Sequence, residues 1–333
     1  MNSSQKFNSL NDKSAWAYTK QKANFDDLYK STKLFYEIPN VTTVNVEDYF
    51  STNFAKYGIS SNRHRILAIC QMFGLITKSA YYSRGGTYSD EVVTPAFVEL
   101  VKHAINSKEY NIIRSEQLLK IKVKAIIDTT NCRDDYFIYP FIFLFLVMWK
   151  LDKEYGVKKV SLNKLWSYVL TCKSMNEVDD AVNWMMDPNA VVSPYVSQYK
   201  SDSRILTLFF DNTKMFSQEG GLLSLNHPIA DVFYDDFILK QDLAILSSYL
   251  LNDAQYETYL NNIQNFNIDL TDNPTGIVKH TRRKTVFKKS GSGSSITSQK
   301  DITVVIPEKI SSVENAYKDL VSLKYPLYHL CVV

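Results

Sequence analysis

Positively charged side chains offer the first chemistry that this sequence could perform. Six cations lie between residues 279 and 289, and the stretch 273–300 around them contains no acidic residue. The flexible segment SGSGSS follows at once. Such a basic arm would neutralise phosphates of a nucleic acid, and the alternative is a solvated flank of the linker. The six cations are Lys279, Arg282, Arg283, Lys284, Lys288 and Lys289.

A second group of candidate residues lies at the start of an apolar, helix-forming stretch. There the backbone N–H groups and side chains of Ser61, Asn62, Arg63, His64 and Arg65 could meet phosphate. For Arg65, a structural ion pair is an equally good interpretation. A tyrosine-rich turn follows, from which an arginine could enter a minor groove. The further candidates are Tyr81, Tyr82, Arg84 and Tyr88 in this turn, Asn163, Lys164 and Lys173 in a helical stretch, and Lys200, Ser203 and Arg204 beyond it.

Residues that would cut a phosphodiester bond do not form a recognisable set. A magnesium-dependent nuclease typically needs an Asp and a Glu-x-Lys pair on adjacent strands. The nearest match is Asp301 with Glu308 and Lys309, but the last two are adjacent, so they point to opposite faces of a strand. The five histidines do not pair at ligand spacing, and no nucleotide-binding or hydrolase motif is present. We therefore assign no catalytic residue, metal site or cofactor, and expect Mg²⁺ only if a nuclease domain is present.

The composition predicts a globular protein with a sizeable core. Of 333 residues, 45% are hydrophobic and 22% are charged, and the net charge of +3 is too small to indicate nucleic acid by itself. The longest apolar run, residues 139–151, is too short to cross a bilayer and predicts the most buried helix, with Pro140 in its first turn. We expect a cytoplasmic protein that does not contact a membrane. The widely spaced Cys70, Cys132, Cys172 and Cys331 are expected to be reduced thiols.

Two stretches share an order of predicted elements. In the first, a helix in RHRILAICQMFGLITK precedes a turn at Gly85-Gly86, the strand EVVTP and the helix AFVELVKH. In the second, the helix RILTLFFDNT precedes the strand KMFSQ, a turn at Gly220-Gly221, the strand LLSLN and a helix after Pro228. Glycine supplies the positive φ that a tight hairpin needs. This order is typical of a winged helix, a helix-turn-helix variant that binds DNA, although similar units also bind proteins.

The expected fold is mainly α with small β-hairpins (α+β), with two winged-helix modules joined by a helical block. Residues 1–135 would hold an N-terminal segment and the first module, 136–200 the helical block, and 201–270 the second module. A basic linker would follow at 271–300. The segment 301–333 would either dock on the body or begin a further domain. In the helical block, Ser174 and Glu177 have the spacing of a capping box.

The chain resembles the DNA-recognition region of AlwI-like type IIS restriction and nicking endonucleases over roughly residues 12–240. The resemblance lies in the order of the predicted elements and in their residue patterns. The segments that carry it are SAWAYTKQKANFDDLYKSTKLF, NRHRILAICQMFGLITK with YSDEVVTPAFVELV, YPFIFLFLVMWKL with VSLNKLWSYVLTCKSMNEVDDAVNWM, and ILTLFFDNTKMFSQEGGLLSLNHPIAD.

This resemblance implies sequence-specific recognition of double-stranded DNA as part of a type II restriction endonuclease. The catalytic part would be lost, truncated or placed on a separate domain or subunit. If the chain is an enzyme, the resemblance implies a Mg²⁺-dependent site-specific endodeoxyribonuclease. The alternatives are a stand-alone winged-helix DNA-binding protein, such as a replication initiator or transcription regulator, and a scaffold that binds only proteins. The base sequence that would be read does not follow from these residues.

Overall fold

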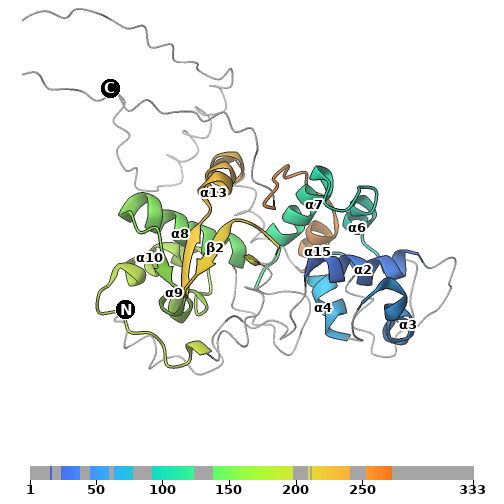
Figure 1. The fold of residues 1–333 in the computed structure, drawn as a ribbon, viewed down its shortest axis with the longest axis horizontal. Coiled ribbons are helices and arrows are strands. Elements are labelled where there is room, and N and C mark those ends of the chain that lie inside the picture. The colour runs from blue at the N-terminus through green and yellow to red at the C-terminus, as the bar shows by residue number, and fades with distance from the viewer. Residues whose placement is uncertain are drawn as a thin grey trace, which may run out of the picture. The chain divides into compact units, whose positions relative to one another are not determined.

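A computed structural model describes residues 16, 24–37, 46–59, 64–77, 92–123, 138–197, 209–210, 212–240 and 253–271. All of them belong to the first of two compact units, Met1–Ile277, whereas the second unit is Val278–Val333. The described part is mainly helical, as Figure 1 shows. It also contains a small antiparallel sheet of three strands. The expected α+β class is therefore confirmed.

In the N-terminal half of the first unit, the described residues form helices and one short antiparallel pairing. Helix α2 packs against both α3 and α4. The segments after α4 and before α6 pair through the bridge Ile76↔Val93, and Thr94 then caps α6 by accepting a hydrogen bond from the backbone N–H of Phe97. The elements are α2 (Phe25–Tyr36), α3 (Val46–Asn53), the 3-10 turn η1 (Phe54–Tyr57), α4 (His64–Met72), α6 (Pro95–Leu100) and α7 (Lys108–Leu119).

The C-terminal half has helices around a β-hairpin. Helix α10 packs against α8 and α9, and α8 also contacts β3. The sheet order is β1-β3-β2, so the two-residue strand β1 joins the outer side of the hairpin. The elements are α8 (Pro140–Tyr155), β1 (Val160–Ser161), α9 (Leu162–Val169), the 3-10 turn η2 (Met175–Glu177), α10 (Val178–Met186), β2 (Phe216–Glu219), β3 (Leu222–Leu225), α13 (His227–Phe233) and the π-helical turn η3 (Tyr234–Ile238). Helix α15 (Asp253–Asn261) comes last of the described elements in sequence but packs beside α7 of the first half (Figure 1), where the Leu260 carbonyl accepts a hydrogen bond from the Gln117 amide at 2.9 Å.

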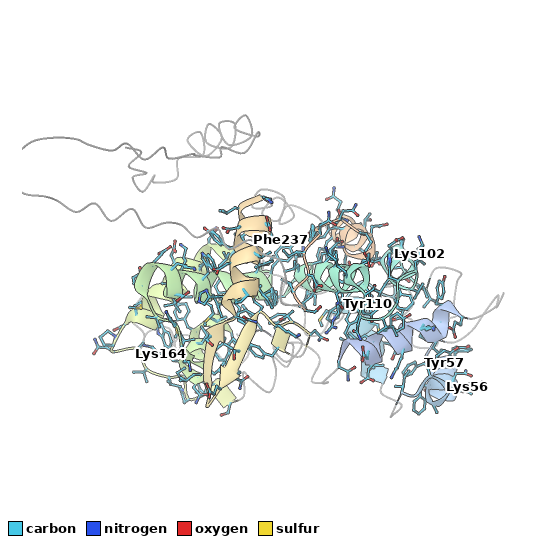
Figure 2. All side chains as sticks on the ribbon, turned by 45° about the horizontal axis from the view of Figure 1, so that its top comes forward. Lys56, Tyr57, Lys102, Tyr110, Lys164 and Phe237 are labelled. Atoms are coloured by element: carbon cyan, nitrogen blue, oxygen red, sulfur yellow. The ribbon has the colours of Figure 1, made fainter. Side chains whose placement is uncertain are left out.

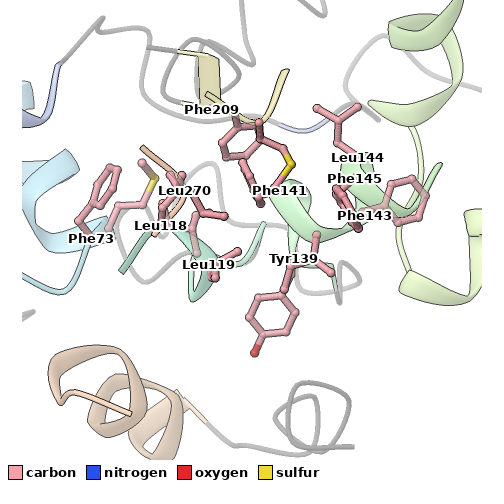
Figure 3. Close-up of a cluster of buried hydrophobic side chains, with 14 of the residues drawn as sticks. Phe73, Leu118, Leu119, Tyr139, Phe141, Phe143, Leu144, Phe145, Phe209 and Leu270 are labelled. Carbon is pink, nitrogen blue, oxygen red and sulfur yellow. The ribbon is translucent and has the colours of Figure 1, made fainter. Parts of the chain in front are cut away.

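Helix α8 forms the centre of the core, as its apolar sequence predicts. Pro140 is its first residue, where the missing N–H costs no helical hydrogen bond. Phe143, Leu144 and Val147 are fully buried. Figure 3 shows the aromatic side chains of this helix among other buried residues, including Phe141 in edge contact with Phe209 at 5.2 Å between ring centroids. The prediction that this run is a buried helix is confirmed.

The hairpin β2–β3 forms because two glycines adopt conformations that other residues avoid. Gly220 and Gly221 have φ values of 57° and 78°, and the strands pair from Phe216↔Leu225 to Glu219↔Leu222. Two consecutive positive φ values are typical of a type I′ turn, whose twist matches that of the strands. The predicted glycine hairpin is thus confirmed here. The corresponding turn at 85–86 lies outside the described residues.

The predicted capping box and two of the predicted reduced cysteines are also confirmed. The Ser174 side chain and the Glu177 carboxylate form a capping box at η2. Cys70 and Cys172 are buried free thiols, as expected, whereas Cys132 and Cys331 lie outside the described residues. The capping box depends on residues that are close in sequence, and the free thiols depend on burial.

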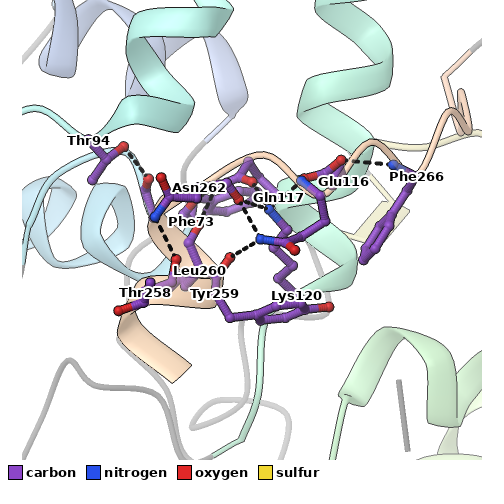
Figure 4. Close-up of polar contacts among 12 residues, drawn as sticks. Phe73, Thr94, Glu116, Gln117, Lys120, Thr258, Tyr259, Leu260, Asn262 and Phe266 are labelled. Carbon is purple, nitrogen blue, oxygen red and sulfur yellow. Dashed lines mark hydrogen bonds and ion pairs between the residues drawn. The ribbon is translucent and has the colours of Figure 1, made fainter. Parts of the chain in front are cut away.

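A buried polar network fastens the segment after α15 to α7, as Figure 4 shows. The Lys120 ammonium lies 2.6 Å from Oε1 of Glu116 and donates to the Asn262 carbonyl at 2.7 Å. The Glu116 carboxylate also accepts hydrogen bonds from the backbone N–H groups of Gln264 at 2.6 Å and Phe266 at 3.0 Å. Desolvation lowers the pKa of Lys120 to about 8, although Glu116 acts in the opposite direction. Both charged side chains are almost fully buried, so this pair holds the segment 262–271 in place.

The two halves share one order of elements. Among the described elements, each half has helices, then an antiparallel pairing, then a helix that has proline at its first or second position. In the first half the helices are α2, α3 and α4, followed by α6. In the second half they are α8, α9 and α10, then two helical residues at 209–210 before the hairpin, followed by α13.

Candidate nucleic-acid interface

Most of the predicted DNA-binding side chains lie outside the described residues. His64 and Arg65 begin α4, but their side chains are not among those described. Of the predicted set, the structure places only the side chains of Asn163, Lys164 and Lys173. The others that lie outside the described residues are Ser61, Asn62, Arg63, Tyr81, Tyr82, Arg84, Tyr88, Lys200, Ser203, Arg204, Lys279, Arg282, Arg283, Lys284, Lys288 and Lys289.

Lys164 joins α9 to the end of α10. Its ammonium donates to the carbonyl oxygens of Met185 and Asp187, each at 2.9 Å, and lies 5.7 Å from the centre of the Trp184 ring. The last carbonyls of a helix lack intrahelical partners and carry partial negative charge, so a cation stabilises them. Figure 2 shows Lys164 among the side chains of this half. These contacts give Lys164 a structural task in addition to any contact with a ligand.

Lys173 lies in the exposed turn between α9 and η2. Its backbone N–H donates to Oε1 of Glu177 at 2.6 Å, beside the hydrogen bond from Ser174 at 2.9 Å. The Glu177 carboxylate therefore fixes the backbone of this turn. Asn163 is exposed on α9, and its carbonyl accepts a hydrogen bond from the Ser167 hydroxyl at 2.7 Å.

The outward face of α10 is acidic. Asp179, Asp180 and Asn183 are exposed, whereas the residues between them are buried against α8 and α9. Lys150 of α8 forms an ion pair with Asp179, so the face is only partly neutralised. Carboxylates at this density repel a phosphate backbone rather than attract it. This face of α10 is therefore less favourable for a phosphate backbone than a basic face would be.

Helix α4, the third helix of the first half, is enclosed by other elements. Every side chain from Ile66 to Ile76 other than the glycine is buried, including the polar Gln71. Gly74 follows with a φ of 63°, and its backbone carbonyl accepts a hydrogen bond from the Thr94 hydroxyl at 2.5 Å. Within the described part of the chain, α4 therefore offers no exposed side chain to a ligand from Ile66 onward.

The sequence did not single out the polar residues at the base of the hairpin. His227 begins α13, and its Nε2 lies 2.9 Å from Oδ2 of the nearly buried Asp152 on α8. Its Nδ1 lies 3.5 Å from Oδ1 of Asp231, which also accepts a hydrogen bond from Lys153 at 3.0 Å. The chain shows no sequence signal for this contact, because α8 and α13 are distant in sequence.

Metal-binding clusters and membrane-spanning helices were both sought in the part of the chain that the structure describes. There, no group of three or more His, Cys, Asp or Glu residues is placed to hold a metal ion. None of the described helices is long and apolar enough to span a bilayer. No protein-family model matches this chain, and no curated protein matches its sequence.

Proposed function

We propose that this chain binds double-stranded DNA through two winged-helix modules. A winged helix is a helix-turn-helix variant in which a β-hairpin follows the third helix. The observation that supports the proposal is the order that the described elements of both halves share, namely helices, an antiparallel pairing and a further helix. The second module adds β1 beside β3, which gives the three-stranded sheet order β1-β3-β2.

The two modules would contact DNA differently. In the first, the cations Arg63 and Arg65 immediately precede the buried body of α4, so they would approach phosphates from the start of that helix. In the second, the acidic face of α10 makes the hairpin side the better candidate. The arm from Lys279 to Lys289 would add affinity that does not depend on base sequence.

The resemblance to type IIS restriction and nicking endonucleases narrows the proposal to recognition within a restriction system. The nuclease chemistry would then lie in another domain or subunit. A stand-alone regulator or replication initiator is the alternative within the same DNA-binding class. A Mg²⁺-dependent plasmid cleavage assay separates them: site-specific cleavage by this chain supports an endonuclease, and intact plasmid under conditions of saturated binding supports a separate DNA-binding protein.

Fluorescence anisotropy with labelled duplexes tests the binding proposal. We expect the double variant Arg63→Ala, Arg65→Ala to weaken duplex binding by roughly tenfold or more, because each charged contact contributes about 1.5–3 kcal/mol. Lys240→Ala is a matched control, because this exposed lysine already pairs with Asp236 at 2.7 Å. Equal affinities for the parent, the double variant and the control would contradict the assignment of residues 61–65.

A protein-binding module is the second candidate function. The acidic face of α10 favours it, together with exposed apolar residues that follow this helix, such as Val191 at 60% and Val192 at 41% exposure. This candidate predicts no measurable binding to duplex DNA even at low salt. The anisotropy experiment therefore also separates the two classes.

A further inference from the structure

An open pocket of about 460 Å³ lies at the base of the β2–β3 hairpin. It is formed where β2 begins and β3 ends, next to the start of α13. Five of its seven lining side chains are polar or cationic, and two are apolar. Its lining contains no carboxylate. The residues are Thr213, Lys214, Phe216, Ser217, Leu225, Asn226 and His227.

The pocket combines one exposed cation with neutral hydrogen-bond donors. The Lys214 side chain is exposed, and within the described residues its ammonium forms no ion pair. Ser217 is exposed on β2. The Asn226 amide uses one N–H to donate to the Lys214 carbonyl at 2.9 Å, which leaves its second N–H for a ligand. An anion with several acceptor oxygens matches this set of donors.

Nearby carboxylates are already paired with other groups. Asp152 lies 2.9 Å from His227, and Asp231 lies 3.0 Å from Lys153. The Lys153 ammonium offsets the charge of Asp231 and so reduces the repulsion that an incoming anion would meet there. Within the second half, this pocket therefore accommodates a phosphate better than the acidic face of α10 does.

The backbone around the pocket is fixed before any ligand arrives. The Lys214 N–H donates to the Leu270 carbonyl at 2.8 Å, and the Asn226 N–H donates to the Met215 carbonyl at 2.8 Å. The first bond ties the hairpin to the segment 262–271, whereas the second, together with the Asn226 amide, holds the two ends of the hairpin together. A site whose backbone is already ordered loses less entropy when it binds a ligand.

We propose that this pocket binds a phosphate group, with the DNA backbone as its source and Lys214 as its charged contact. The choice of DNA rests on the proposed function. Ser217 and Asn226 supply neutral hydrogen bonds to the phosphate oxygens. Such a contact positions the protein on the duplex and does not distinguish base sequences.

Duplex binding measured across salt concentrations tests the site. We expect Lys214→Gln to weaken binding roughly tenfold and to reduce the slope of log affinity against log salt by about 0.9, the value for one phosphate contact. Lys108→Gln is the matched control, since Lys108 is an exposed lysine at the start of α7. The Lys214 side chain is exposed, so circular dichroism and the melting temperature should be unchanged.

A titration with inorganic phosphate, followed by ¹H–¹⁵N NMR of the full chain, provides an independent readout. We expect saturable shifts at the amides of Lys214, Ser217 and Asn226, and their loss in Lys214→Gln. If the parent binds duplex DNA but Lys214→Gln retains the parental affinity and salt slope, the inference is wrong and the proposed function stands. If phosphate shifts these amides while the duplex does not bind, the pocket takes a free phosphate, and both the DNA source and the proposed function are overturned.

Discussion

Replacing Lys120 with methionine tests how the segment 262–271 is held on α7. Methionine fills a similar volume but removes the ammonium that lies 2.6 Å from Glu116. The buried carboxylate would keep only the backbone donors of Gln264 and Phe266, without a counterion. Removing one partner of a buried pair typically costs about 3–5 kcal/mol of the free energy of unfolding. That is a large fraction of the 5–15 kcal/mol typical of a whole domain.

The assay is urea unfolding, followed by tryptophan fluorescence and far-UV circular dichroism. Lys102→Met is the matched control, because Lys102 pairs with Glu99 at 2.6 Å on the surface, with 58% of the lysine side chain exposed. We expect the control to lose at most about 0.5 kcal/mol. The double variant Glu116→Gln, Lys120→Met should recover part of the loss, because no buried charge remains unpaired. If Lys120→Met costs no more than Lys102→Met, the buried pair does not hold the segment.

The Lys120–Glu116 pair also predicts how the free energy of unfolding depends on pH. Burial lowers the pKa of Lys120 to about 8 in the folded protein, against about 10.4 in an unfolded chain. Between these values the unfolded chain binds more protons, so this group increases the free energy of unfolding as the pH rises. We therefore expect the stability difference between the parent and Lys120→Met to widen from pH 8 to about pH 10. A difference that narrows over this range would contradict the inferred protonation.

Two further predictions concern a glycine and a cysteine. A Cβ on Gly74 would lie 2.8 Å from Cγ of Leu260 and 2.9 Å from Nε2 of Gln117, so Gly74→Ala should cost at least about 3 kcal/mol in urea unfolding. Gly156→Ala, at a similar φ with open space around it, should cost only about 1–2 kcal/mol, and equal losses would refute the close approach. Burial raises the pKa of Cys70 to about 12, so iodoacetamide and peptide mapping should detect its alkylation only in denaturant; rapid alkylation in the native protein would refute its burial.

Local sequence patterns predicted the elements of this fold better than their pairing. The apolar run of α8, the capping box at Ser174 and the glycine turn of the hairpin each depend on residues close in sequence. By contrast, Val160 pairs with Leu223 of β3, more than sixty residues away, and no local pattern specifies that partner. The contact of Glu116 with Gln264 spans an even longer separation. Such pairings depend on how the whole chain packs.

The candidate interface was harder to predict than the fold. The pattern VDDAVNW contains the acidic residues of α10, but only the packing shows that Asp179 and Asp180 face outward. Likewise, the sequence did not indicate that the Lys164 ammonium donates hydrogen bonds to the carbonyls at the end of α10, and its contact with phosphate stays a prediction. The sequence did not indicate Lys214 as a candidate, because a single lysine before a strand has no distinctive spacing.

The most direct test of the central claim is duplex binding by the full chain at two salt concentrations. Anisotropy should show saturable binding at about 50 mM salt that weakens by roughly tenfold or more at 200 mM, as expected when several phosphates release counterions. Competition with unlabelled random duplex should then reveal whether a preferred sequence exists. Absence of binding at 50 mM salt, with the protein folded by circular dichroism, would contradict DNA recognition and favour the protein-binding candidate.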